Sequence, residues 1–311
     1  MTRQTTDQQH VAAGTKPRVH TPLHPGDRWF DGLPYFLPGF GLYALFVLYP
    51  FALTLWYSFH EWSGVGRSTW VGLQNYARLL QDQLFWHALL NNLFFLVFYT
   101  LIPLFIGLVL AAVLNQRWLR GAAAYRALLF LPQILPMALI GVIWRWLYNP
   151  AFGPISRALQ GLGLSGLVRP WLGDFTWALP SVGIIASWYF YGFCMAVFVA
   201  GIQKIDTSLY DAAAIDGAGS GAQFRHVTLP GLRPEIGVVL IFTFIAALKV
   251  FDLVFVTTRG GPGDQTLVAS LYLYSNAFQR SAVGYGATIA VAITVLVVGA
   301  ALLLRRLQES E

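Results

Sequence analysis

The chain has 311 residues, of which 56% are hydrophobic, 15% are aromatic and only 11% are charged, and its formal net charge is +6. Soluble domains carry about 25% charged residues, so this composition excludes an ordinary soluble domain and indicates a membrane protein. In such a chain the positive charge reports on topology and is no evidence for nucleic-acid binding.

The first 33 residues are predicted to form a flexible cytoplasmic tail. They are largely polar and contain Pro17, Pro22 and Pro25. They also lack the apolar core of about 7–15 residues that marks a cleaved signal peptide. Residues 34–311 are therefore expected to form a single transmembrane domain.

Apolar runs within residues 34–311 predict an all-α membrane protein with six transmembrane helices. A spanning helix needs about 20 residues to cross a hydrocarbon core of about 30 Å. Backbone groups in lipid must be paired within the segment, so long continuous apolar runs favour helices. The predicted spans are 35–59, 93–114, 122–147, 175–202, 236–258 and 282–304. Prolines at four positions predict bends in these helices: Pro103, Pro132, Pro136 and Pro180.

The distribution of Lys and Arg predicts the orientation. With both termini and the second and fourth connections taken as one side, twelve Lys and Arg residues lie there and six lie on the other side. Cytoplasmic connections carry the excess of positive charge. Both termini and the polar segment 206–231 are therefore expected in the cytoplasm.

The polar segment 206–231 lies between the fourth and fifth predicted spans and predicts a short helical hairpin. Ser208 and Asp211 fit a capping box, in which the hydroxyl and the carboxylate each pair with the other residue's backbone N–H. Alanines continue this helix, and Gly217 is expected to end or bend it. A second short helix would carry Phe224 and Val227 and stop before Pro230.

This segment resembles the EAA loop of ABC-importer permeases, with Asp for the usual Glu and Val for the usual Ile. The matching positions are Asp211, Ala212, Ala213, Gly217, Val227, Leu229 and Pro230. The resemblance implies that the hairpin, with Phe224 as a further anchor, lies in a cleft of an ATP-binding subunit and couples its closure to the membrane helices.

Further stretches resemble the sugar and oligosaccharide branch of these permeases, which includes the maltose and glycerol-phosphate permeases. They are 71–76, 85–92, 248–252 and 257–262. The resemblance implies two ATP-binding subunits, a second and non-identical permease subunit, and an external substrate-binding protein, all in a bacterial or archaeal plasma membrane. The Gly-Lys pair of a phosphate-binding loop is absent from the sequence, so ATP and Mg²⁺ are expected on the partner subunit, and the chain itself is expected to have no enzymatic activity.

The fourth and fifth predicted spans hold the candidate residues of the substrate pathway. Aromatic residues cluster in the fourth span, among them Trp188, Tyr189, Phe190 and Phe193. The resemblance to sugar permeases implies substrate contacts at Tyr189, Phe190 and Phe193 in this span and at Thr243 and Ala247 in the fifth. Packing between helices or against lipid is an equal alternative for each aromatic residue. Lys249 and Asp252 are costly inside a membrane, at about 2.5–3.5 kcal/mol each. They either line the pathway or pair on one helix face near the outer interface.

Two functions other than sugar import are alternatives. An importer of glycerol-3-phosphate-like or other small polar solutes would have a similar permease. An ion-gradient-driven secondary transporter would show paired intramembrane acids or broken internal repeats, whereas Asp252 is the only acid in its span. The single cysteine, Cys194, excludes an internal disulfide and a cysteine metal site, and no metal site is expected.

Overall fold

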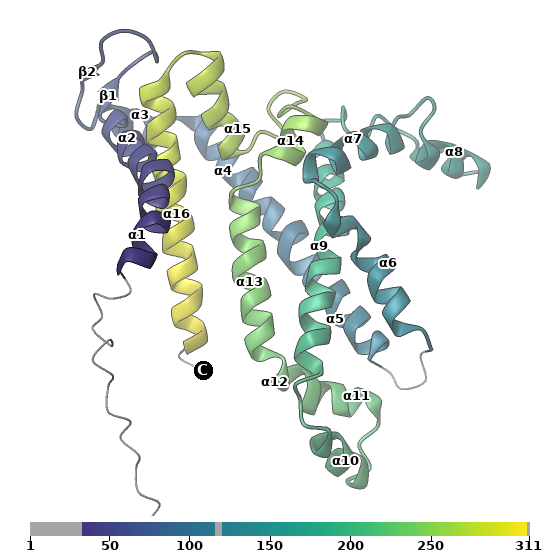
Figure 1. Ribbon diagram of the computed structural model, residues 1–311. Coiled ribbons are helices and arrows are strands. Elements are labelled where there is room, and N and C mark those ends of the chain that lie inside the picture. Colours follow the sequence, from purple (N-terminus) through teal and green to yellow (C-terminus); the bar gives the residue numbers. More distant parts are fainter. Residues whose placement is uncertain (1–32, 116–119, 310–311) are drawn as a thin grey trace, which may run out of the picture. The chain divides into compact units, whose positions relative to one another are not determined.

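The computed structural model describes residues 33–115 and 120–309 (Figure 1). The predicted tail, 1–33, lies outside them except for Leu33. The chain divides into two units, residues 1–51 and 52–311. The described part of the first unit is an exposed apolar helix, made of α1 (Leu33–Tyr43), the π-helical η2 (Ala44–Leu48) and the start of α2 (Tyr49–Tyr57).

The second unit begins within α2 and is helical apart from one short ladder, in which β1 (His60–Glu61) pairs antiparallel with β2 (Thr69–Trp70). Its helices up to residue 202 are α3 (Gln74–Gln81), α4 (Gln83–Leu96), the π-helical η3 (Val97–Leu101), α5 (Ile102–Leu114), α6 (Ala122–Ile134), α7 (Met137–Leu147), α8 (Pro154–Gly161), the 3₁₀ turn η4 (Ser165–Leu167) and α9 (Ala178–Ile202).

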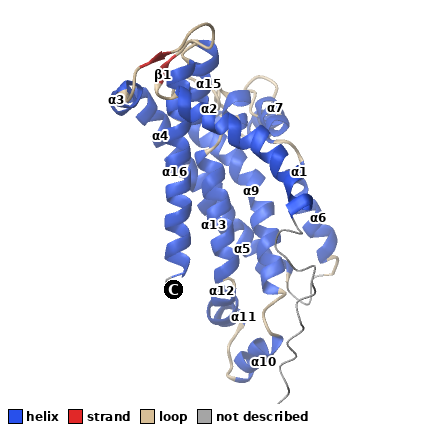
Figure 2. Ribbon diagram, turned by 60° about the vertical axis from the view of Figure 1, so that its left-hand side comes forward, coloured by secondary structure: helices blue, strands red, loops and turns tan. Residues whose placement is uncertain are grey.

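The hairpin segment follows as α10 (Thr207–Ile215), α11 (Ser220–Gln223), the π-helical η5 (Phe224–Thr228) and α12 (Leu229–Gly231). The chain then continues through α13 (Arg233–Leu248), α14 (Asp252–Thr257), α15 (Ala269–Tyr274), the π-helical η6 (Ser275–Gln279) and α16 (Val283–Glu309). The hairpin lies at one end of α5, α9 and α13, and α14 and α15 lie at the other end (Figures 1 and 2).

Four helical stretches of the described chain are long and apolar enough to cross a membrane. They are Leu33–Tyr57, Gln83–Leu114, Ala178–Ile202 and Val283–Arg306. Two bent pairs, Ala122–Ile134 with Met137–Leu147 and Ser220–Gly231 with Arg233–Leu248, pass the same test together and bring the total to as many as six. The all-α membrane class is confirmed.

Prolines act differently according to their place in a helix. The helices on either side of Leu135 and Pro136 meet at 95°, which confirms the predicted bend in the third span. Pro103 is the second residue of α5, which begins directly after the π-helical turn of η3. Pro180 lies in the first turn of α9, where its missing N–H costs no hydrogen bond, and α9 continues unbroken for 25 residues.

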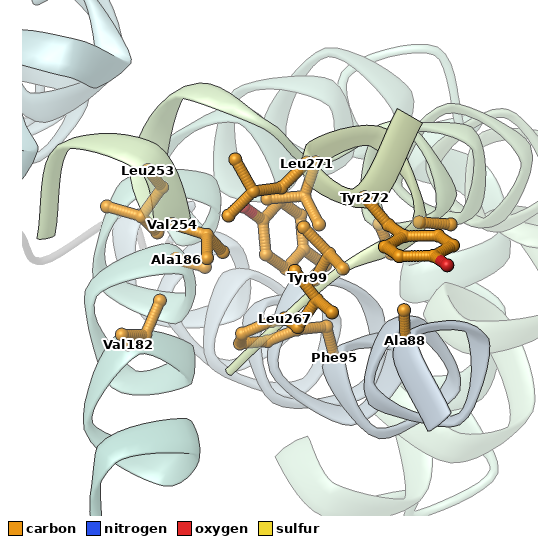
Figure 3. Packing of buried hydrophobic residues seen from close by; sticks show 14 of the residues in the cluster. Ala88, Phe95, Tyr99, Val182, Ala186, Leu253, Val254, Leu267, Leu271 and Tyr272 are labelled. Atoms are coloured by element: carbon orange, nitrogen blue, oxygen red, sulfur yellow. The ribbon is translucent and has the colours of Figure 1, made fainter. Parts of the chain in front are cut away.

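Helix α9 runs through both hydrophobic clusters of the second unit. Val182, Ala186 and Phe190 belong to the larger cluster, which includes Tyr99 and gathers side chains from α4, α14 and α15 (Figure 3). Cys194 and Phe198 belong to the smaller cluster, nearer the hairpin, with residues of α5 and α13. One straight helix therefore joins the interior at one end of the unit to the interior at the other.

A glycine allows the closest packing within the smaller cluster. A β-carbon on Gly107 of α5 would lie 2.6 Å from the β-carbon of Cys194 on α9, a distance that real side chains do not show. Cys194 is fully buried at this contact, so its place in the structure is that of a small packing residue.

Candidate functional site

The first helix of the hairpin begins earlier than predicted. Asp206 is the N-cap of α10, and its carboxylate accepts a hydrogen bond of 2.9 Å from the backbone N–H of Ser208. This hydrogen bond lowers the pKa of the exposed Asp206 carboxyl. The predicted capping box of Ser208 with Asp211 is therefore wrong. Aspartate caps a helix as well as serine does, and Asp206 reaches the first N–H groups two positions sooner.

The end of α10 is fixed by Gly217, as predicted. Gly217 has a φ of +78°, the left-handed conformation that other residues adopt at a cost. The N–H of Ala218 donates to the carbonyl of Ala213 at 2.8 Å, and the N–H of Gly217 donates to that of Ala214 at 3.1 Å. These two bonds form a Schellman motif, so the chain turns sharply toward the second half of the hairpin.

The second half of the hairpin does not stop before Pro230. Helical geometry continues from α11 through η5 and ends only at Gly231. In η5 the N–H of Leu229 donates to the carbonyl of Phe224, five residues back. A π-helical turn departs from the regular α ladder, in which proline normally removes a hydrogen bond. Pro230 is the second residue after this turn, in the first turn of α12. The predicted stop is corrected accordingly.

A side-chain hydrogen bond joins the two halves. The hydroxyls of Tyr210 on α10 and Thr228 on η5 lie 2.9 Å apart, and Thr228 is buried. Between the halves and the ends of α5 and α9 lies a cavity of about 940 Å³, which is lined in part by Asp211 and Gln223. The two halves of the hairpin are therefore in contact at Tyr210 and Thr228, and the cavity lies next to this contact.

Apolar side chains attach the hairpin to the membrane helices. Phe224 and Leu229 are partly buried and pack against the smaller hydrophobic cluster, whose members include Leu232 and Phe198. A β-carbon on Gly231 would lie 2.7 Å from the Ile205 side chain, so the two ends of the hairpin segment are in close contact where it joins the membrane helices. Movement of the hairpin would be transmitted directly to α5, α9 and α13.

The opposite face of the hairpin is exposed and partly apolar. Leu209 and Ile215 on α10 are 53% and 87% exposed. Of the eight predicted coupling residues, four are exposed and four are half-buried. The exposed ones are Asp211, Ala212, Gly217 and Pro230, and the half-buried ones are Ala213, Phe224, Val227 and Leu229. Among the half-buried residues, Phe224 and Leu229 are the ones that pack against the smaller hydrophobic cluster, and the exposed Asp211 lines the cavity.

The predicted pathway residues divide by burial. Phe190, Thr243 and Ala247 are buried inside the chain, and the Thr243 hydroxyl donates to the Val239 carbonyl at 2.8 Å. Tyr189 and Phe193 are half-buried, and the Phe193 ring lies 4.6 Å from that of Phe242. Trp188, Lys249 and Asp252 are exposed. The eight residues are therefore divided between the interior of this chain and its surface.

The fifth predicted span is interrupted where its charged residues lie. Helix α13 ends at Leu248, and α14 begins at Asp252. Lys249 lies in the break, directly after α13, and Asp252 is the first residue of α14. The two form no ion pair within the described residues, where Lys204–Glu235 is the ion pair observed. The predicted pairing on one helix face is wrong because the helix is broken between them.

Asn92, which lies directly before the second predicted span, binds the backbone at this break. Its side chain is fully buried on α4 and donates to the carbonyls of Ala247 and Leu248 at 2.9 and 3.2 Å. Its own carbonyl accepts from the N–H of Ala269 at 2.9 Å. The neighbouring Asn91 donates to the carbonyl of Leu267 at 2.8 Å. In the sequence, two adjacent asparagines at the start of an apolar run are the feature that could have indicated buried amides with backbone partners.

Asp82 forms a second polar cluster, just before α4. Burial opposes its ionisation, but hydrogen bonds from the hydroxyls of Tyr272 and Tyr285 and from the N–H groups of Phe85 and Leu84 outweigh that effect and lower the pKa of this carboxyl. The carboxylate ties the start of α4 to α15 and α16. In the described part of the chain, His, Cys, Asp and Glu form no group that could hold a metal ion.

Comparisons with known proteins identify the family of this chain. Residues 103–309, which include the hairpin, match the family described as "Binding-protein-dependent transport system inner membrane component". The probable ABC transporter permease protein YurN of Bacillus subtilis (strain 168) is 35% identical over 87% of this chain and 94% of its own length. The diacetylchitobiose uptake system permease protein NgcF of Streptomyces coelicolor is 32% identical over 89% of this chain and 84% of its own length.

A solved structure has the same fold. It is a chain of the crystal structure of a bacterial ABC transporter involved in the import of the acidic polysaccharide alginate. The similarity has a TM-score of 0.79 and covers 90% of this chain and 96% of that chain, at 23% sequence identity.

Proposed function

The chain belongs to the family of binding-protein-dependent transport system inner membrane components, and from that premise we propose that it carries a sugar or oligosaccharide across the plasma membrane of a bacterium or archaeon. It is a permease subunit and not an enzyme, and ATP hydrolysis takes place on a separate subunit in this family. NgcF is named for the uptake of diacetylchitobiose, and the stretches 71–76 and 85–92 resemble the sugar branch, which together favour a carbohydrate.

The hairpin 206–231 is proposed to receive the work of ATP hydrolysis. Its geometry carries this proposal: the outward face presents the exposed apolar side chains of Leu209 and Ile215, and the inward face is packed on the membrane helices through Phe224 and Leu229. A short helix with an exposed apolar face suits docking into a groove of a partner protein. Closure of that partner would then favour one conformation of the membrane helices over another, which is the physical content of coupling.

The proposed assembly contains two ATP-binding subunits, which would hold ATP and Mg²⁺, a second and non-identical permease, and an external binding protein. Both termini and the hairpin would lie in the cytoplasm, as the distribution of Lys and Arg indicates. The pathway residues Trp188, Lys249 and Asp252 are exposed in this chain, so a partner permease could complete a site around them.

Co-purification tests the assembly. Tagged protein extracted in mild detergent should bring with it an ATP-binding subunit and a second permease, identified by mass spectrometry. A cysteine at position 215, introduced as Ile215→Cys, should cross-link to the ATP-binding subunit, whereas Leu128→Cys, on an exposed site of α6, should not. Cys194 is fully buried and should not compete. A chain that purifies alone and drives uptake in ATP-free vesicles from an ion gradient would overturn the proposal.

The substrate is tested separately on the reconstituted complex with its binding protein. ATP-dependent uptake of a labelled disaccharide is expected, without competition from excess glycerol 3-phosphate. If glycerol 3-phosphate is imported and the disaccharide is not, the transport assignment stands and the sugar assignment fails.

A further inference from the structure

A groove between α6 and α9 lies outside both the hairpin and the broken span. It has a volume of about 390 Å³. Small side chains on the two helices leave the space open, namely Ala127, Ala196 and Ala200. None of these three residues is among the coupling or pathway residues described above.

The two ends of the groove differ in chemistry. Arg126 and Gln203 form its polar end, here called the mouth, and Phe130 and Met195 lie farther along α6 and α9. Gln203 follows the last residue of α9, and the Arg126 Nη2 donates at 3.1 Å to the carbonyl of Leu114, the last residue of α5. The mouth therefore lies where two membrane-spanning stretches end. Met195 precedes Gln203 by eight residues, about 12 Å along the helix.

Arg126 carries a charge that the described protein does not neutralise. The described residues place no carboxylate within ion-pair distance of it, and its Nε is buried without a hydrogen-bond acceptor. A buried donor of a charged group that lacks an acceptor is costly, so an anionic acceptor at this position would be stabilising. Helix α6 begins at Ala122, one turn before Arg126, and its N-terminal dipole also favours an anion.

We propose that this groove binds an anionic phospholipid of the inner leaflet, with the phosphate beside Arg126 and an acyl chain lying toward Met195. A polar mouth at the membrane boundary with an apolar interior fits an amphiphile. A sugar would find too few polar partners on the apolar walls, and a free phosphate would gain nothing from them. Basic pockets between membrane helices on the cytoplasmic side are suited to anionic headgroups. The proposal depends on the membrane placement of the family and not on the identity of the transported solute.

Titration of the delipidated complex, followed by native mass spectrometry, tests the proposal. Dioleoylphosphatidylglycerol and dioleoylphosphatidylcholine are compared at equal concentration, and the wild-type complex should prefer the anionic lipid by about fivefold, the equivalent of about 1 kcal/mol per Arg near an anionic surface. Arg126→Gln should abolish the preference, because glutamine can still donate to Leu114 but carries no charge. Arg120→Gln removes the same charge from an exposed position outside the groove and should keep the preference.

A second variant tests the interior of the groove. Ala196→Leu should fill it and reduce binding of both lipids, with Arg126 unchanged. Equal binding of the two lipids by the wild-type complex, or an unchanged preference in Arg126→Gln, would overturn the proposal. So would displacement of the lipid by about 10 mM inorganic phosphate, which indicates a free-anion site. A cross-link from Ala200→Cys to a second permease would show that protein covers the groove and would also overturn it.

Discussion

Substitution of Gly217 tests whether the backbone turn at the end of α10 transmits the work of ATP hydrolysis. No atom lies within 4 Å of a β-carbon built on Gly217, so alanine would cause no steric clash within the chain. The cost of Gly217→Ala comes from the left-handed backbone alone and is about 1–2 kcal/mol. A penalty of that size lowers the population of the native turn about 5- to 30-fold relative to alternatives. It is too small to unfold the whole chain.

Gly219 supplies a matched control. It also has no atom within 4 Å of a built β-carbon, but its φ of −68° suits any residue. Gly219→Ala should therefore behave as wild type, and Gly217→Asn should lie between the two, since asparagine tolerates the left-handed conformation. The expected order of activity is wild type and Gly219→Ala, then Gly217→Asn, then Gly217→Ala.

The assay is ATP hydrolysis by the reconstituted complex, with and without its loaded binding protein, at equal amounts of assembled complex. The stimulated rate should fall in Gly217→Ala and remain in Gly219→Ala. Equal loss in both variants would place the effect in a partner contact and not in the turn. Full stimulation in Gly217→Ala would refute the reasoning.

Three further predictions concern single hydrogen-bonded groups. Asn92→Ala removes three hydrogen bonds and leaves the carbonyl of Leu248 and the N–H of Ala269 without their partner, at about 1–3 kcal/mol each. It should lower the thermal stability of the purified protein more than Asn91→Ala, which leaves one backbone group, the carbonyl of Leu267, without its partner. The pKa of Asp82 in the folded protein lies below its ordinary value of 3.8. Its contribution to the free energy of unfolding is therefore present above about pH 4 and is lost as the pH falls through the folded pKa. The melting temperature should consequently change less between about pH 6 and pH 3 in Asp82→Asn than in wild type. Tyr210→Phe removes the hydroxyl contact between the hairpin halves and should cost about 1 kcal/mol, and a double-mutant cycle with Thr228→Val should show coupling; additive effects would deny the bond any role.

The sequence predicted those features that depend on neighbouring residues. Apolar runs located the membrane helices, Pro132 and Pro136 located the bend of the third span, and Gly217 located the end of α10. Each of these signals lies within the feature that it predicts. The glycine acts through its backbone conformation, and the prolines act through their missing N–H.

Local sequence patterns did not predict features that depend on a choice between two similar residues or on contacts with distant residues. Asp206 and Ser208 are both good capping residues, and local pattern alone did not choose between them. The interruption after Leu248 depends on the amide of Asn92, which lies 156 positions earlier in the chain. A residue so distant in sequence leaves no periodic or spacing signal near the break.

The Asn92 contacts also have a consequence for biosynthesis. The amide reaches backbone groups 155 and 177 positions later in the chain. At typical translation rates of about 5–20 residues per second, Asn92 is made roughly 10–35 s before Ala269. Throughout that interval a polar amide at the edge of an apolar helix lacks its final partners. The hydrogen bonds that Asn92 makes to Ala247, Leu248 and Ala269 can therefore form only after α13 and the start of α15 have been synthesised.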